Sequence, residues 1–485
     1  MKHFVFLILL TLAGSVAAPF NPIWGLLLYY SVSILKPQTM WDWSLPVEWP
    51  WAKLAAAAAI LGVLLNASKL FNRARFSLIV ALMFAFLILM TFSTLTAHDP
   101  ALSQFWLLEY AKVLVMAIIV TLLVERMWHI RALGAVVLVC IGYIGWEANY
   151  RYFFDGRMDI YHHGFGDLDN NGAGLMLAMG LPFAYAFAMT ASRYWMRIVS
   201  VVAGFFILHA MLMTYSRGAM LASIVAVAWL LAHHKPRKQA AAIAAVLALI
   251  VAIQAGPEIR ERFMLTTQFE RDYSAQSRLT SWEAAYEIVK EHPLTGVGIR
   301  NSNTYTKNYG ADQVGRTIHS QYLQIAADSG IPSLLVYLGL VCASLACMGQ
   351  ARKLVVQKIA QDDPELAWWG RHRLRHMHTV ILSCQGSLIV FLFGSVFLSL
   401  EVFEMPWMLM GIAAVLPRVV RSEIERMREP VSAEIPEGDD ERPATLEPSL
   451  APVPIASGSK SKSKKRKLNR LRSTWILRGK GLPQS

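Results

Sequence analysis

Two residues near predicted membrane boundaries have side chains suited to proton transfer and to phosphate binding. His319 lies where a long polar interval meets the next hydrophobic segment, and an imidazole can take a proton from a hydroxyl near neutral pH. Arg217 lies in Thr214-Tyr-Ser-Arg217-Gly, a very short connection between two hydrophobic segments. A guanidinium group held there suits bidentate phosphate binding. The simpler alternatives are a histidine that caps a helix and an arginine that extends from a helix end towards water.

Arg278 is the third candidate, and it belongs to a predicted amphipathic helix that stops at Pro293. The apolar face of this helix recurs at steps of three and four residues: Leu279, Trp282, Tyr286 and Val289. Arg278 then falls in the first turn, where a positive charge interacts unfavourably with the helix dipole. An ordinary surface arginine is the simpler interpretation, and an external anion that balances the charge is the functional one.

A cluster of short polar residues, Asp167-Leu-Asp169-Asn170-Asn171, precedes another hydrophobic segment. An Asp-x-Asp pair can hold a divalent metal, but Asp and Asn are also common helix caps. We favour capping or hydrogen bonding to a substrate. Histidines occur at 162 and 163 and at 372, 376 and 378, yet no Cys or carboxylate completes either set at a diagnostic spacing. We expect neither a metal nor another cofactor.

The long polar interval spans residues 256–318 and contains eight Lys or Arg and eight Asp or Glu residues. A loop of this length in a chain with short connections commonly has a function. Within it, Thr295-Gly-Val-Gly298 predicts a two-glycine turn. It is not a phosphate-binding loop, because no Gly-Lys-Ser/Thr follows.

The composition is that of a membrane protein: of 485 residues, 55% are hydrophobic and 16% charged, and the mean hydropathy is +0.40. The net charge is +13, but residues 460–480 contain ten Lys or Arg residues and no acid. We therefore expect this basic tail to lie near anionic membrane lipid, and we expect no nucleic-acid partner.

Hydrophobic segments that can cross a bilayer need roughly 20 residues, or somewhat fewer inside a bundle. Thirteen candidates occur, at 4–19, 22–35, 52–67, 76–95, 108–124, 131–149, 172–190, 196–213, 218–232, 239–255, 320–349, 379–400 and 405–420. Basic residues mark alternate connections, which the positive-inside rule assigns to the cytoplasm. The connections at 96–107, 150–171, 214–217 and 256–318 then lie outside, together with His319.

The start of the chain does not fit this alternation. Residues 36–50 must lie outside, whereas Lys2 and His3 favour the inside. Both conditions hold if one of the first two segments does not cross, and Ser15-Val-Ala-Ala18 resembles a signal-peptide cleavage site. We therefore expect 12 or 13 crossings. Tryptophans at 41, 43, 49 and 51 fit an aromatic belt at the outer interface.

These observations predict an all-α, polytopic membrane bundle with one large outer loop that contains an amphipathic helix. N-terminal transmembrane helices occupy residues 1–255, the loop occupies 256–318, and C-terminal transmembrane helices occupy 319–420. Residues 421–485 form a cytoplasmic tail, basic at its end, whose Pro-, Glu- and Ser-rich composition predicts disorder.

The order of the motifs over residues 165–345 resembles the O-antigen ligase and polymerase superfamily of bacterial inner-membrane glycan enzymes. The motifs are Tyr215-Ser-Arg217-Gly, Arg278-x-x-x-Trp282, His292-Pro-Leu-Thr-Gly296-Val-Gly298, His319-Ser-Gln-Tyr-Leu and Gly330-Ile-Pro-Ser-Leu-Leu. Asp169-Asn-Asn171, leading to Leu181-Pro182, is most similar to one branch, the O-glycosylation ligases associated with the exosortase A system. The basic tail is not part of this pattern.

The resemblance implies a metal-independent, inverting glycosyl transfer on the periplasmic face of the inner membrane. The donor would be a glycan on undecaprenyl diphosphate, with His319 as general base and Arg217 and Arg278 holding the diphosphate. The acceptor would be lipid A core, a protein or another glycan. We also expect neighbouring polar and aromatic residues to bind substrate: Asp169, Asn170, Asn171, Tyr215, Ser216, Arg316, Trp282 and Tyr322.

Two alternatives remain open. A polymerase would use the same donor and the same residues to extend one lipid-linked chain with another. A transporter or lipid-linked glycan flippase would normally place ionisable groups near the middle of the bilayer. The hydrophobic segments of this chain carry few charges, which favours chemistry at the membrane surface.

Overall fold

The computed structural model describes residues 2–45, 49–72, 76–157, 159–254, 273–310, 317–361, 368–400 and 402–427. These residues form helices, and they contain no β-strand beyond an isolated bridge between Phe165 and Leu168. The predicted tail lies outside the described residues from 428 onward. The first helices are α1 (Lys2–Ala17), α2 (Ile23–Leu35), α3 (Pro37–Met40), α4 (Trp51–Leu65), α5 (Ala67–Phe71), α6 (Leu78–Leu95), α7 (Pro100–Leu123), α8 (Met127–Phe154) and α9 (Asp159–His162).

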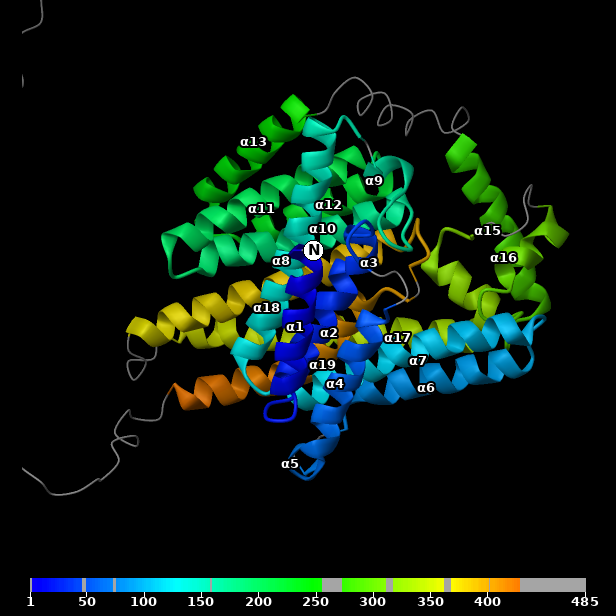
Figure 1. Ribbon diagram of the computed structural model, residues 1–485, viewed down its shortest axis with the longest axis horizontal. Coiled ribbons are helices and arrows are strands. Elements are labelled where there is room, and N and C mark those ends of the chain that lie inside the picture. The colour runs from blue at the N-terminus through cyan, green and yellow to red at the C-terminus, as the bar shows by residue number, and fades with distance from the viewer. Residues whose placement is uncertain are drawn as a thin grey trace, which may run out of the picture. The chain divides into compact units, whose positions relative to one another are not determined.

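Four further membrane-length or near-membrane-length helices precede the polar interval, and three follow it (Figure 1). The former are α10 (Asn170–Thr190), α11 (Tyr194–Met213), α12 (Arg217–His233) and α13 (Arg237–Gln254). The interval itself contains α15 (Tyr273–Glu291), α16 (Ser302–Tyr305) and the 3₁₀ helix η3 (Thr306–Tyr309). The last helices are α17 (Gln321–Ala360), α18 (Trp368–Gly394) and α19 (Glu404–Arg426).

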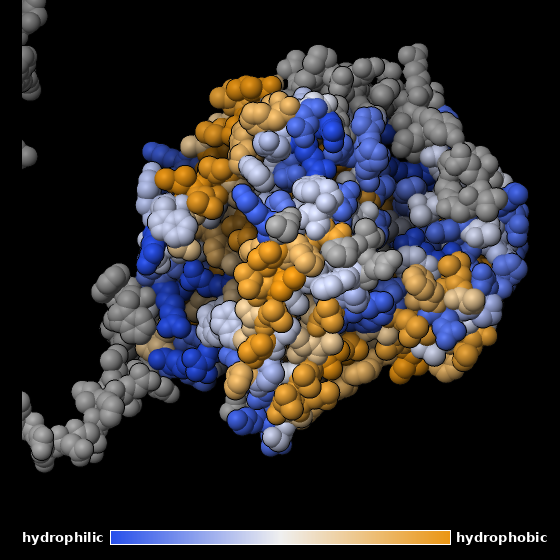
Figure 2. Space-filling view, in the orientation of Figure 1, coloured by the Kyte–Doolittle hydropathy of each residue, from blue (hydrophilic) through white to orange (hydrophobic). Residues whose placement is uncertain are grey.

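The predicted fold class, an all-α polytopic membrane bundle, is confirmed. Among the described residues, seven helices are long and apolar enough to cross a membrane, and four shorter helices are also apolar. Figure 2 shows apolar side chains over α1 and α4 in the middle of this face, where Leu9 and Leu64 are each more than 60% exposed. Such a surface suits contact with lipid.

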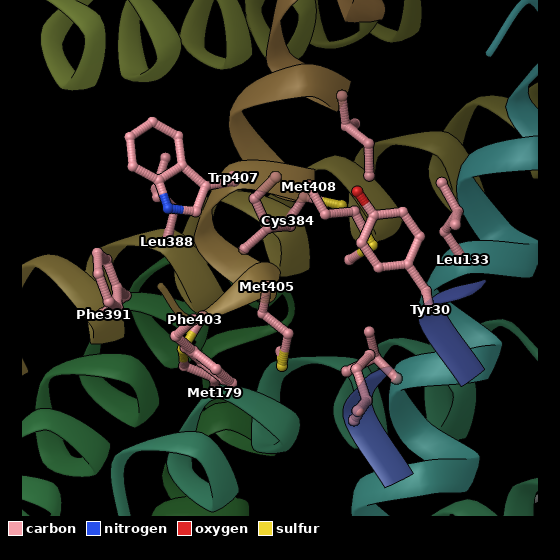
Figure 3. Packing of buried hydrophobic residues seen from close by; sticks show 14 of the residues in the cluster. Tyr30, Leu133, Met179, Cys384, Leu388, Phe391, Phe403, Met405, Trp407 and Met408 are labelled. Atoms are coloured by element: carbon pink, nitrogen blue, oxygen red, sulfur yellow. The ribbon is translucent and has the colours of Figure 1, made fainter. Parts of the chain in front are cut away.

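The centre of the bundle is built on α10, which packs against α8, α11, α12 and α18. Small residues permit these close contacts: a Cβ atom at Gly180 would lie 2.8 Å from Ile141 and one at Gly394 only 2.4 Å from Leu175. Beside α10, the helices α18 and α19 contribute large buried side chains such as Phe391 and Trp407 (Figure 3). These helices fix the positions of the connections at their ends.

Several helices extend beyond the hydrophobic segments that predicted them. Helix α7 begins at Pro100 and α8 ends at Phe154, so the predicted loops 96–107 and 150–171 are partly helical. Helix α19 continues to Arg426, past the predicted start of the tail at 421. The buried Glu423 explains this extension, because it accepts hydrogen bonds from Arg373 (2.7 Å) and from the Met127 amide (3.3 Å). Conversely, α18 ends at Gly394 rather than at 400.

The first two helices pack against each other, and contacts at their ends show where those ends lie. The His3 ring stacks on Trp41, with ring centroids 4.9 Å apart. At the other end of α1, the Pro19 carbonyl accepts a hydrogen bond from Asn66. The chain start therefore lies with the predicted outer segment 36–50, against the preference of Lys2 and His3 for the inside. Trp41 is also buried, so it is not part of an exposed aromatic belt.

The connections predicted to lie on the same side of the membrane make contact with one another in pairs. Asn301 of the polar interval hydrogen-bonds to the backbone of Asp99 between α6 and α7. Asn170, before α10, donates to the Thr214 carbonyl between α11 and α12 (3.0 Å). In Figure 1, α15 and α16 lie beside the ends of α6 and α7. The four connections predicted to lie outside are thus linked, and their location outside the cytoplasm stays a prediction.

Helix α17 is broken at Gly330, whose φ of 82° and ψ of 167° are not helical. Pro332 has no amide hydrogen, and the Ile331 amide donates to the Pro293 carbonyl (2.8 Å) instead of to Ala327. The two carbonyls left free in α17 accept hydrogen bonds from the predicted glycine turn. Ala327 accepts from Val297 (3.0 Å), and Asp328 accepts from Gly298 (2.9 Å). The break therefore holds the polar interval against the bundle.

Helix α15 ends before Pro293 as predicted, but its start and its buried face differ from the prediction. It begins at Tyr273, so Arg278 lies in the second turn and the argument from the helix dipole does not apply. Leu279 and Tyr286 are exposed, whereas the buried positions are mostly small: Ser281, Ala284, Ala285 and Ile288. Small side chains let α15 approach the neighbouring backbone closely, and the larger apolar residues therefore lie at the edge of the contact.

Replacing Gly330 by alanine should destabilise the protein, because the new Cβ would lie 2.2 Å from the Leu294 carbonyl oxygen at a positive φ. We expect a loss of at least ~2 kcal/mol, since the left-handed conformation alone costs about 1–2 kcal/mol. Gly339→Ala in the same helix is the control, because its Cβ would meet only Leu82 at 3.8 Å. Thermal unfolding in detergent, followed by tryptophan fluorescence, measures both. Equal melting temperatures would contradict the role of the break.

Candidate active site

Arg217 and Arg278 line the same polar cavity, of about 370 Å³, although they lie on α12 and α15. Both side chains are partly buried. The remaining lining residues are Tyr161, His162, Asn170, Asn171 and Tyr215. The two guanidinium groups, two amides and two phenolic groups provide many hydrogen-bond donors. Among the described residues, no carboxylate lines this cavity. Such a cavity suits a ligand with several anionic oxygens.

The connection between α11 and α12 positions Arg217. Ser216 caps α12 by accepting a hydrogen bond from the Ala219 amide (3.3 Å), and Arg217 is therefore the first residue of the helix. Tyr215 has a φ of 52°, which turns the chain sharply before the cap. The neighbouring Thr214 carbonyl is held by Asn170 (3.0 Å). The backbone of Arg217 is thus fixed near the N-terminal end of α10.

Arg278 reaches this cavity because α15 packs onto the bundle. The Trp282 ring stacks on Phe397, with ring centroids 6.4 Å apart. One turn further, Ala285 and Ile288 are buried in a small apolar cluster with Ile318. Trp282 therefore holds the helix that carries Arg278, and it does not itself line either of the cavities described here.

His319 lines a larger cleft of about 1160 Å³. Apolar side chains from α2, α4 and α7 form much of its wall, including Val32, Ala56, Phe105 and Val113. The charged residues of the lining come from both ends of the chain: Lys36, Lys53, Glu109, Lys112, Asp167, Asp169, Arg300 and Glu404. A cleft of this kind can receive a molecule that has both apolar and polar parts.

Asp169 connects the two cavities. Its carboxylate caps α10 by accepting a hydrogen bond from the Gly172 amide (2.7 Å), and its other oxygen accepts one from Asn171 (3.2 Å). Asp169 lines the cleft of His319, whereas Asn171 lines the cavity of the two arginines. The predicted capping role is therefore present. Asp169 also lies between the cleft that His319 lines and the cavity that Arg217 and Arg278 line.

The chain around His319 is fixed on both sides. The Ile318 side chain before it is buried, and the Gln321 amide after it donates to the carbonyls of Ser395 and Leu398 (both 2.9 Å). The Thr317 hydroxyl lies 3.1 Å from Nε2 of the imidazole. His319 itself is partly buried and has a φ of 55°. The imidazole is thus presented to the cleft from a constrained turn.

Left-handed backbone conformations are concentrated at these two cavities. Among the described residues, four residues other than glycine have a positive φ: Lys36, Tyr215, Arg300 and His319. Tyr215 lines the smaller cavity, and the other three line the cleft. This conformation costs roughly 1–2 kcal/mol for a side chain with a Cβ, and such strain is typical of functional sites.

The remaining predicted residues lie elsewhere. Tyr322 donates a hydrogen bond to the Leu392 carbonyl (2.9 Å), which ties α17 to α18. Ser216 is buried as the cap of α12. Arg316 lies outside the described residues. The structure therefore brings Arg217, Arg278, His319 and the segment 169–171 to the cavities, and it gives Tyr322, Ser216 and Trp282 contacts that stabilise the fold.

Four basic residues of the cleft were not predicted from the sequence: Lys36, Lys53, Lys112 and Arg300. Two of them, Lys36 and Arg300, have a left-handed backbone. Lys36 forms an ion pair with Asp167 (2.8 Å), and a Cβ at Gly166 would lie 2.4 Å from the Lys36 side chain. Arg300 lies over the Trp106 ring at 4.6 Å. The signal for Arg300 was its place two residues after the Gly-Val-Gly turn. No local pattern marks Lys36, whose partner lies 131 residues away.

The Asp-x-Asp pair does not form a shared metal site. Asp167 pairs with Lys36, and Asp169 caps α10. In the part of the chain that the structure describes, no group of three or more His, Cys, Asp or Glu residues is arranged to hold a metal ion. The hydrogen bond and the positive charge of Lys36 hold the pKa of Asp167 below its ordinary value.

Comparison with known families gives a match for the region that contains the three candidate residues. Residues 202–338 match the family model described as O-Antigen ligase. The chain therefore contains an O-antigen ligase-type domain. Residues 1–155 match a family of unknown function, DUF5935. No curated protein matches the chain.

The O-antigen ligase-type domain supplies Arg217, Arg278, Arg300 and His319 to the two cavities. The N-terminal family region supplies Lys36 and the apolar wall from α2, α4 and α7. Asp169, Asn170 and Asn171 lie between the two matched regions. The candidate site is thus assembled from both matched regions and from the segment that joins them, and the match of residues 202–338 supports a membrane enzyme of the ligase or polymerase type.

Asp167→Asn should lower the free energy of unfolding by less than ~1 kcal/mol at pH 7, because the lost ion pair with Lys36 is largely exposed. The pKa of Asp167 is lowered in the folded protein, so its stabilising effect is present above the unfolded pKa of about 3.9 and is lost only in stronger acid. The difference in melting temperature should therefore be equal at pH 5 and pH 8. Asp155→Asn, an exposed acid in the same connection, is the control. A difference that shrinks between pH 8 and pH 5 would contradict this assignment.

Proposed function

We propose that this protein is a glycan ligase that acts on the periplasmic face of the bacterial inner membrane. It transfers a glycan from undecaprenyl diphosphate to an acceptor hydroxyl by metal-independent, inverting glycosyl transfer. The match of residues 202–338 to O-antigen ligase supports the class of enzyme. The observation that carries the proposal is the shared cavity of Arg217 and Arg278, next to the cleft that His319 lines.

The smaller cavity takes the diphosphate of the donor. Arg217 and Arg278 each present a planar group with several donors, which suits the oxygens of a diphosphate. As the bond between the anomeric carbon and the diphosphate oxygen breaks, negative charge develops on that oxygen. Two fixed positive groups stabilise this charge where it forms. Asn170, Asn171 and Tyr215 add neutral hydrogen-bonding groups to the same cavity.

His319 acts on the acceptor from the cleft. The acceptor oxygen forms the new bond to the anomeric carbon from the side opposite to the diphosphate, and its proton passes to the imidazole. The electron pair of the broken bond leaves with undecaprenyl diphosphate, so the configuration at the anomeric carbon inverts. No intermediate bound to the enzyme is required. The size and the mixed lining of the cleft suit an acceptor together with part of a lipid chain.

The location outside the cytoplasm rests on charge and on contacts. The candidate site lies on short connections with few basic residues and on the interval 256–318, where eight Asp or Glu residues balance eight Lys or Arg residues. These connections contact one another in pairs. The other connections carry the basic residues that the positive-inside rule assigns to the cytoplasm. Membrane lipid and the lipid-linked donor are therefore the expected partners, with the donor entering from the outer leaflet.

His319→Ala should reduce transfer by at least ~10²-fold, because a positioned base contributes about 10²–10⁴-fold. Purified enzyme in nanodiscs, with a lipid-linked glycan and an acceptor, gives the rate under single-turnover conditions. His163→Ala is the matched control, because His163 is exposed and lines neither cavity. If His319→Ala inserts normally and transfers at the rate of the unmodified enzyme, the assignment of the base is wrong.

Arg217→Lys and Arg278→Lys should each weaken donor binding and lower the rate. The two effects combined should reduce kcat/KM of each variant by about 10–100-fold. Lysine keeps the charge but loses the fork of donors, and a hydrogen bond to a charged group contributes about 1.5–3 kcal/mol. Arg157→Lys, in an exposed connection, is the control. The measurement is the dependence of the rate on donor concentration. Unchanged KM and kcat in both variants would show that the two arginines do not bind the donor.

The nature of the acceptor separates a ligase from a polymerase. The resemblance to O-glycosylation ligases favours a protein acceptor, whereas O-antigen ligases in the wider sense also include enzymes that act on lipid A core. Mass spectrometry of glycoproteins and lipopolysaccharide from a strain without the gene should show which product loses its glycan. If the purified enzyme instead lengthens lipid-linked repeats without a separate acceptor, it is a polymerase.

A further inference from the structure

A buried polar network lies directly beneath the turn that carries His319. Gln324 and Asp328 stand one turn apart on α17 and are almost completely buried. The Gln324 amide nitrogen donates to the Asp328 carboxylate (2.8 Å) and to the Ser302 hydroxyl (2.7 Å). It also lies 3.2 Å from the Asn303 side-chain oxygen. We call these four residues the Gln324–Asp328 network.

The network reaches two of the three strained segments that border the cleft, those of Arg300 and His319. The Gln324 side-chain oxygen accepts a hydrogen bond from the Ile318 amide (3.3 Å), directly before His319. The Asp328 carboxylate accepts hydrogen bonds from the amides of Ser302 (3.1 Å) and Arg300. His319 and Arg300 both have left-handed backbones and line the cleft. Two residues of one helix therefore hold both turns by their backbones.

A carboxylate is well suited to the position of Asp328. Its two oxygens receive N–H groups from Gln324, Ser302 and Arg300, and these bonds offset the cost of burying the group. The Asp328 carbonyl also accepts hydrogen bonds from Gly298 and Ser93 at the break of α17. The network is thus attached to the point at which the polar interval is fixed to the bundle.

We propose that Gln324 and Asp328 are positioning residues, which hold the imidazole of His319 and the Arg300 turn in the geometry needed for transfer. The proposal rests on the proposed function of His319 as the base. A base has to lie within about 3 Å of the proton that it removes, and a displacement of about 1 Å can cost roughly 10²-fold in rate. Neither Gln324 nor Asp328 lines the cleft, so neither contacts substrate there.

Asp328→Asn tests this role with little change in volume. Its NH₂ group would face N–H groups that need acceptors, and the network would lose at least one hydrogen bond. We expect kcat to fall at least ~10-fold, as for a misplaced base. The KM for the lipid-linked donor should stay within about twofold, because the cavity of Arg217 and Arg278 contains no residue of the network. Asp99→Asn is the control, since Asp and Asn cap α7 about equally well.

An exchange of the two groups provides the rescue. Gln324→Glu alone places a second carboxyl group beside Asp328 and should also lower kcat. The double variant Gln324→Glu with Asp328→Asn again contains one carboxylate and one amide, and we expect it to recover most of the loss. Additive losses in the double variant would show that the two residues do not act as a pair.

Hydrogen exchange separates this inference from the proposed function. Peptide 317–323 should exchange at least ~10-fold faster in Asp328→Asn. Gln324 is then no longer held by Asp328 and should lose the hydrogen bond that it accepts from the Ile318 amide. The same peptide should exchange normally in Asp99→Asn. If exchange and kcat both stay at the level of the unmodified protein, or if kcat falls while exchange does not change, the positioning role is wrong. If His319→Ala retains transfer in the same assay, the assignment of the base fails, and the exchange rates still decide whether the network holds the turn.

Discussion

Helix α17 cannot continue through Gly330 and Pro332, because the proline has no amide hydrogen and the glycine has a left-handed backbone. Two carbonyls inside the bundle would otherwise lack partners, which is costly in a protein that faces lipid. The turn at 296–298 supplies the missing donors, and Asn301 links the same segment to Asp99. Residues 293–301 of the polar interval are therefore attached to the bundle by hydrogen bonds that mostly involve backbone groups. Both His319 and the helix that carries Arg278 depend on this attachment.

The apolar core beneath the interval is small, with five buried hydrophobic residues that include Ala285, Ile288 and Ile318. A core of this size contributes much less to stability than the bundle does. Polar contacts therefore determine how the interval is placed, which explains its glycines at close approaches and the buried Asn301 and Gln324. An arrangement of this kind can hold residues in strained conformations without a large hydrophobic domain.

Hydropathy located thirteen segments, and each of them overlaps a helix in the part of the chain that the structure describes, because such a helix needs a continuous apolar surface. It did not locate the polar ends of α7, α8 and α19, which are stabilised by contacts with other helices. Arg217, Arg278 and His319 stood out as polar residues at the borders of apolar segments. Their separation into two cavities could not be predicted, since it depends on packing between segments far apart in the chain. The predicted face of α15 was half right: Trp282 and Val289 pack against the small apolar cluster, whereas Leu279 and Tyr286 are exposed. The spacing of large apolar residues could not show that the closest contacts use the small residues Ala and Ser.

The two cavities resolve an electrostatic conflict in the proposed reaction. The donor site needs concentrated positive charge, whereas a base that becomes positively charged is disfavoured beside two guanidinium groups. In the structure, Arg217 and Arg278 line one cavity and His319 lines the other. Asp169 borders the cleft of His319, and its hydrogen bond to Asn171 leads to the arginine cavity. The carboxylate thus lies on the side of the imidazole, whereas the neutral amides of Asn170 and Asn171 line the cavity in which the proposed reaction places the diphosphate. The anomeric carbon then has to lie at the boundary itself, between a site that attracts the leaving group and a site that accepts the proton.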